Sequence, residues 1–226
     1  MKFVTNSFLE FFKKLEKNNN KEWFEKNRGK YELNVLEPAK EFVLIAGEKN
    51  REFIPNIKAI PRIDKSIFRL HRDVRFSKNK QPYKTNMGIF FWEGESKRME
   101  CTGFYFHVEP KMFFLGVGVY LFSPEYLKKY RQAIVKPSIA IELDSIIRNL
   151  IKTNEFEIGG KYYKKVPRGF DREYQYANYL LFNGLYIGTK KLDTKILLSK
   201  NNQLEYIIEV FKKLSPLHNW LMENIY

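Results

Sequence analysis

Six cationic side chains gather in one short stretch of the chain, residues 68–85, which reads FRLHRDVRFSKNKQPYKT. Three of them are arginines, and a single aspartate is the only carboxylate among them. Guanidinium groups bind phosphate or carboxylate through two parallel hydrogen bonds, and lysine adds a point charge. The stretch therefore predicts a binding site for a negatively charged group, formed by Arg69, Arg72, Arg75, Lys78, Tyr83 and Lys84.

The same stretch alternates between polar and apolar residues, which predicts a strand over 66–76 that runs into a polar loop. Arg69, Asp73 and Arg75 would form a polar row on one face of this strand. Arg72 falls on the apolar face, where a charge is costly unless a carboxylate or a ligand compensates it. An internal salt-bridge network explains the same pattern, so the stretch is interpreted either as a ligand site or as structural electrostatics.

His107 and Asp73 are the two candidates for acid–base catalysis. Histidine titrates near neutral pH, and an expected strand over 101–108 places His107 on the same face as Tyr105. A structural hydrogen bond is the alternative explanation for a single histidine in a strand. The three histidines lack the spacing of metal ligands and the chain has one cysteine, so no metal site is predicted, and no cofactor is indicated.

The chain as a whole is strongly basic, with a net charge of +14 over 226 residues. Such a charge is typical of proteins that bind nucleic acid. A lysine-rich surface that maintains solubility is the favoured explanation of the global charge, but it does not explain the arginines of 68–85. A small ligand bearing phosphate or carboxylate is therefore the favoured partner, with or without catalysis. Nucleic acid binding and a structural or interaction module are the alternatives.

The periodicity of apolar residues predicts an α+β fold in a single domain, 1–226. Helical spacing dominates residues 5–50, and a period of two begins near residue 66. Short links between the strands favour an antiparallel meander, and residues 123–226 are mixed and mostly helical. Helices from both ends of the chain are expected to pack on a sheet with strands near 66–76, 87–92, 101–108 and 111–121.

Three local features refine this prediction. Asn19 and Glu22 have the spacing of a capping box at the start of a helix. Gly159 and Gly160 suggest the turn of a hairpin. Pro216 is expected to break the amphipathic helix that begins near residue 203.

The cysteine content, the first residues and the length of the apolar stretches predict the cellular compartment. The single Cys101 forms no intrachain disulfide, which fits a reducing compartment. The first residues lack the apolar core and cleavage site of a signal peptide, and no apolar stretch is long enough to cross a bilayer. A cytoplasmic protein without a membrane partner is therefore expected.

Several motifs of the chain resemble those of one known family. They occur in the basic stretch as FR at 68–69, RDVRFSK at 72–78, Lys80 and PYKT at 82–85, and elsewhere as NNKEWF at 19–24, GFY at 103–105, His107, GVG at 116–118 and VPRG at 166–169. In this order they are similar to the domain of unknown function 2461, a family of conserved hypothetical proteins. The resemblance covers nearly the whole chain and implies one domain. It implies no activity, cofactor or catalytic residue.

Overall fold

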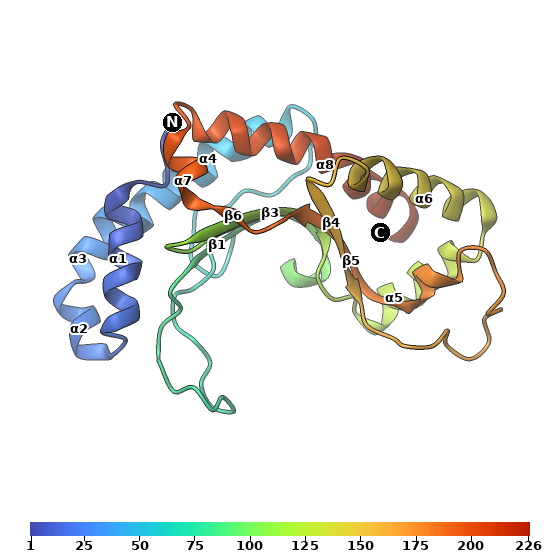
Figure 1. The fold of residues 1–226 in the computed structure, drawn as a ribbon, viewed down its shortest axis with the longest axis horizontal. Helices are drawn as coiled ribbons and strands as arrows, with labels where there is room; N and C mark the ends of the chain where they lie inside the picture. The colour runs from blue at the N-terminus through green and yellow to red at the C-terminus, as the bar shows by residue number, and fades with distance from the viewer. The chain divides into compact units, whose positions relative to one another are not determined.

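The computed structural model describes residues 1–226 and divides them into two compact units (Figure 1). The first unit comprises residues 1–91, 105–115 and 191–210, and the second comprises 92–104, 116–190 and 211–226. Each unit is therefore assembled from segments that lie far apart in the sequence. The prediction of a single domain stays a prediction.

Short helices fill the start of the first unit because their apolar residues recur at helical spacing. Thr5 begins the first of them, since its hydroxyl accepts a hydrogen bond from the backbone N–H of Phe8 at 3.1 Å. The rings of Phe3 and Phe42 stack at 4.7 Å in the core behind these helices. The helical elements are α1 (Asn6–Lys17), α2 (Lys21–Lys26), α3 (Arg28–Tyr31), the π-helical turn η1 (Glu32–Leu36) and α4 (Glu37–Arg51).

An antiparallel sheet follows, which confirms the predicted α+β fold. Its strand order is β1-β2-β3-β5-β4, so the first three strands are neighbours as a meander requires, and β6 pairs with β3. The strands are β1 (Met87–Glu93), β2 (Thr102–Val108), β3 (Met112–Val119), β4 (Phe156–Lys161), β5 (Phe182–Thr189) and β6 (Leu192–Asp193).

Helices from both ends of the chain pack on this sheet. In the first unit, the ring of Phe42 on α4 lies 5.8 Å from that of Phe106 on β2. In the second unit, Phe211 lies 5.2 Å from Phe104. None of the helices combines the length and the apolar character needed to cross a lipid bilayer. The remaining helical elements are η2 (Arg98–Glu100), α5 (Pro124–Ile134), α6 (Pro137–Ile151), η3 (Ala177–Leu181), α7 (Thr194–Ser199) and α8 (Gln203–Ile225).

Two local predictions about the second half of the chain are wrong. The expected hairpin around Gly159 does not form, because β4 pairs with β5, and Gly160 sits with a φ of +99° where the register shifts. The last helix is not broken at Pro216, which lies inside the continuous helix α8. Burial of apolar residues along α8, among them Leu214 and Leu217, offsets the hydrogen bond that the proline removes.

Candidate anion-binding arm

Residues 66–86 form a long arm that precedes β1, visible in Figure 1 as the blue-green loop that extends beyond the end of that strand. Its two limbs run antiparallel and are joined at intervals. The N–H of Lys84 donates to the carbonyl of Leu70, and the N–H of Arg72 donates to the carbonyl of Pro82, both at 2.8 Å. Pro82 has no N–H with which to return a bond, so the ladder is interrupted there.

The prediction of a strand over 66–76 therefore needs correction. This limb is extended, but its pairing consists of isolated bridges, Ile67 with Ile89 and His71 with Tyr83. The side chains on the limb are consequently placed by a few contacts rather than by a continuous strand.

The returning limb is fastened to the turn between α1 and α2 by the side chain of Asn19. Its Oδ1 accepts a hydrogen bond from the N–H of Tyr83 at 3.0 Å, and its Nδ2 donates to the carbonyl of Tyr83 at 2.9 Å. The ring of Tyr83 is buried and stacks on Phe24 at 4.4 Å. Tyr83 helps to hold the arm in place through these contacts, and its role as a ligand contact stays a prediction.

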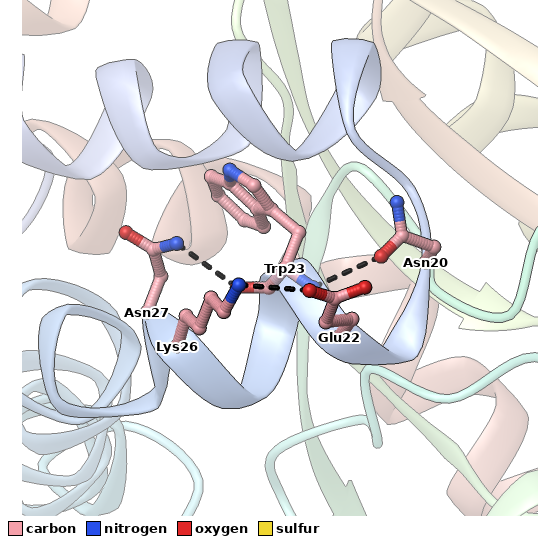
Figure 2. Close-up of polar contacts among 5 residues, drawn as sticks. All are labelled: Asn20, Glu22, Trp23, Lys26 and Asn27. Atoms are coloured by element: carbon pink, nitrogen blue, oxygen red, sulfur yellow. Dashed lines mark hydrogen bonds and ion pairs between the residues drawn. The ribbon is translucent and has the colours of Figure 1, made fainter.

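The capping role predicted for Asn19 belongs to its neighbour. Figure 2 shows that Asn20 accepts the backbone N–H of Trp23 through Oδ1 at 2.9 Å, while Glu22 pairs with Lys26 at 2.8 Å along the helix. Asn20 begins α2 in this way, which leaves the side chain of Asn19 available for the arm.

Replacing Asn19 with alanine is expected to lower the free energy of unfolding by about 1–3 kcal/mol, because two hydrogen bonds to partly buried backbone groups are lost. Amide hydrogen exchange at Tyr83 should accelerate in the same variant. The exposed Asn18, whose amide bonds only to Lys14 of its own helix, is the control position. Unchanged protection of the Tyr83 amide in Asn19→Ala would contradict the assignment.

At the tip of the arm, Arg75 and Asp73 form an ion pair with two hydrogen bonds, 3.0 Å from Nε to Oδ1 and 2.7 Å from Nη2 to Oδ2. The pKa of Asp73 is lowered, chiefly by the hydrogen bond from the Arg75 side chain and also by the charge of Arg69. The Arg75 guanidinium lies 6.0 Å from the ring centroid of Phe76, and that ring is 96% exposed. The single carboxylate of residues 68–85 is thus engaged by Arg75.

Arg72 has no carboxylate partner. Its Nη1 lies 3.4 Å from the carbonyl oxygen of Gln81, and its Nη2 lies 3.5 Å from the hydroxyl of Ser77. Both distances are long for hydrogen bonds to a guanidinium. The half-buried side chain thus retains donor capacity for another group.

The other cations of the arm differ in their surroundings. Arg69 and Lys78 are exposed and make no hydrogen bond or ion pair with the rest of the chain. Lys80 donates to backbone carbonyls of the tip, and the Lys84 ammonium lies 5.6 Å from the ring centroid of Phe68. With six cations and one carboxylate, residues 68–85 carry a net charge of +5.

His107 lies in a polar row on β2. Its Nδ1 is 3.2 Å from the hydroxyl of Tyr105, and its Nε2 is 3.7 Å from the carboxylate of Glu109. Its ring stacks on Phe114 at 5.0 Å. The polar partner of Asp73 is Arg75, so the structure does not bring the two predicted catalytic candidates into one hydrogen-bonded group.

Burial determines the protonation states of His107 and Tyr105. It lowers the pKa of His107, against the opposing effect of Glu109, and it raises the pKa of Tyr105 to about 12. At neutral pH the imidazole and the phenol are therefore both neutral, and Nδ1 and the phenol share a hydrogen bond between neutral groups.

Wild-type protein is expected to lose stability on acidification below pH 6.5 in a way that His107→Gln does not. The unfolded chain protonates this histidine near pH 6.5, whereas the folded chain resists protonation to a lower pH, so the unfolded state binds more protons in that window. Denaturant unfolding between pH 5 and 7.5 measures the difference. A pH profile that is identical in both proteins would show that His107 titrates normally.

Sequence reasoning missed a buried group in the second unit. His218 contacts the hydroxyl of Thr102 through Nδ1 at 3.2 Å and the carboxylate of Glu93 through Nε2 at 2.8 Å. The order of groups resembles a hydrolytic triad, but Thr102 and His218 are fully buried. No substrate reaches the hydroxyl, so the group is structural. These residues are too far apart in sequence to give a signal.

A cavity of about 810 Å³ lies in the first unit, away from the arm. Lysines and carboxylates are mixed in its wall, as Lys13, Lys111, Glu10 and Asp193 show. It contains none of the predicted site residues and has no dominant charge.

Comparison with known proteins gives a family for the chain. The sequence profile of the conserved hypothetical proteins of domain of unknown function 2461 matches residues 7–220 of 226. No curated protein matches the chain at a significant level. The matched span includes the α1–α2 turn, the arm and the sheet. This chain belongs to the family of conserved hypothetical proteins known as domain of unknown function 2461.

Proposed function

We propose that the protein binds single-stranded nucleic acid through the arm, residues 66–86. The observation that carries this proposal is the imbalance of charge on an exposed element, where six cations face one carboxylate. Phosphate groups of a nucleic acid strand supply the missing negative charge, and their binding releases condensed counterions.

The distribution of the cations favours an extended anion over a small one. Arg69 and Arg72 lie on the outgoing limb, Lys78 lies at the tip and Lys84 lies on the returning limb. A small ligand needs groups that converge on a concave site. Cations spread along an exposed arm suit successive phosphates instead.

Phe76 supports single strands over duplexes. Its ring is almost completely exposed and lies beside the guanidinium of Arg75. Proteins that bind single strands without sequence preference combine a basic track with aromatic rings on which bases stack. A paired duplex hides the faces of its bases, so the ring has no use there.

Fluorescence anisotropy with a labelled 20-nucleotide oligothymidylate tests the proposal. We expect saturable binding at 50 mM salt that weakens steeply as salt rises, and weaker binding to a duplex of the same length. Phe76→Ala should reduce affinity for the single strand about 5- to 100-fold, the value of one stacked base, and leave duplex binding unchanged. Absence of oligonucleotide binding, with saturable binding of a phosphorylated metabolite that Arg72→Ala abolishes, would favour a small anionic ligand instead.

A further inference from the structure

Arg131 on α5 is half-buried, and two of its guanidinium nitrogens are buried without a hydrogen-bond partner. Its Nε and Nη2 atoms are inaccessible to solvent and make no hydrogen bond. No carboxylate lies within 4.0 Å of them, whereas Arg148 on α6 pairs with Asp144 at 2.6 Å. Unpaired buried guanidinium groups are among the costliest arrangements in a folded protein, and a native chain retains one only for a reason.

The geometry of Arg131 is that of an arginine poised for an oxyanion. The guanidinium carbon lies over the ring of Tyr163, 4.8 Å from its centroid, in a cation–π contact. Nε and Nη2 lie on one edge of the plane and point their N–H groups in parallel. This edge is the fork that binds two oxygens of a carboxylate or a phosphate.

The elements around this fork are fixed from two sides. The backbone N–H groups of Tyr162 and Tyr163 donate to the carbonyl of Leu181 at 3.0 and 2.9 Å. At the other end of the same connection, the hydroxyl of Tyr174 donates to the carbonyl of Ile134 on α5 at 3.0 Å. Both ends of the connection that carries Tyr163 are thus fastened within the second unit.

Between these fastenings runs the strap, residues 164–173, part of the long orange loop between β4 and β5 in Figure 1. It is mostly exposed, and a side chain at Gly169 would meet no other atom within 4 Å. The strap carries four cations and two carboxylates, and one of these, Asp171, already accepts the N–H of Glu173. The lightly packed strap can shift to admit a ligand, and its excess of positive charge favours an anion.

We propose that the Nε and Nη2 edge of Arg131 is a binding site for one small oxyanion, a carboxylate or a phosphate, which enters beneath the strap. Two oxygens of the anion accept the hydrogen bonds for which Nε and Nη2 have no partner in the protein. The contact with Tyr163 helps to hold the guanidinium in place for the anion. This site lies in the second unit and uses none of the residues of the arm, so it is independent of nucleic acid binding.

Thermal unfolding of Arg131→Met tests the site, because removal of an unpaired buried charge has the opposite effect to removal of a satisfied one. Without added anion, we expect Arg131→Met to unfold at a temperature equal to or higher than wild type. With inorganic phosphate or acetate at matched ionic strength in chloride, wild type should gain a saturable rise of several degrees that Arg131→Met lacks. Arg148→Met removes the same charge from an exposed side chain that already has a carboxylate partner, and this variant should retain the full response.

Phosphate and acetate distinguish the two ligand classes, a phosphate and a carboxylate. The anion whose effect on the unfolding temperature saturates at the lower concentration identifies the class that the site prefers. Arg131→Lys keeps the charge without the fork and should weaken the response at least tenfold. In the NMR spectrum of wild type, the Nε–H resonance of Arg131 should move with the same saturation curve. The proposal is overturned if neither anion stabilises wild type more than Arg131→Met, or if that Nε–H resonance does not respond.

Discussion

A variant in which Arg69, Arg72 and Lys78 are all replaced by glutamine is expected to bind a single-stranded oligonucleotide about 500-fold more weakly than wild type at 50 mM salt. Each lost phosphate contact removes about 0.7 counterions of release, which amounts to roughly a factor of 8 at this salt concentration. None of the three side chains makes an ion pair within the protein, so the folded structure should be unaffected. Anisotropy titrations measure the affinity, and circular dichroism verifies the fold.

The matched control removes three positive charges from exposed helical or helix-flanking positions, with Lys128, Lys136 and Lys212 changed to glutamine. Both triple variants lower the net charge of +14 by the same amount. We expect the control to lose affinity less than fivefold. An equal loss in both variants would mean that only the global charge matters and that the arm has no special role.

Gly118→Ala should destabilise the second unit by about 3 kcal/mol or more. Gly118 lies on β3 with a φ of +125°, a conformation that side-chain-bearing residues rarely adopt. A Cβ at this position would also overlap the backbone carbonyl of Leu185, because β3 and β5 pair directly there. Neither strand can retreat without losing ladder hydrogen bonds. Urea denaturation monitored by circular dichroism measures the change.

Replacements of two other glycines distinguish backbone strain from steric overlap as causes of the destabilisation. Gly169 has a φ of +87° and free space around it, so its replacement by alanine tests backbone strain alone and should cost about 1–2 kcal/mol. Gly29 lies in α3 with free space and an ordinary φ, so alanine there should stabilise the protein by up to about 1 kcal/mol. If Gly118→Ala proved as harmless as Gly29→Ala, the paired register of β3 and β5 would be wrong.

Local sequence patterns predicted the secondary-structure elements that depend mainly on neighbouring residues. The meander of β1, β2 and β3 follows from alternating residues with short links, and its strands lie close to the expected ranges. The pairing of β4 with β5 was not predicted, because 20 residues separate the two strands and no short turn joins them. The break predicted at Pro216 is absent for a related reason. Burial of the surrounding apolar residues outweighs one missing hydrogen bond in α8.

The composition of residues 68–85 located the candidate site, but the contacts that hold the arm in place could not be predicted from the sequence. The excess of arginine over carboxylate in 68–85 is visible in the sequence. The clamp of Asn19 on Tyr83 joins residues 64 positions apart, and nothing in either segment announces it. Likewise, an arginine at helical spacing on α5 looks like any surface residue, and only the fold shows that the fork of Arg131 is buried without a partner.

The most direct measurement for the central claim is the salt dependence of oligonucleotide binding in wild type and in the Arg69, Arg72 and Lys78 variant. If all six cations of the arm contact phosphates, a plot of log K against log salt concentration should have a slope of about −4 for wild type and about −2 for the variant. The Lys128, Lys136 and Lys212 control should retain the wild-type slope. Equal slopes in wild type and the arm variant would contradict the proposal that the arm binds the phosphate backbone.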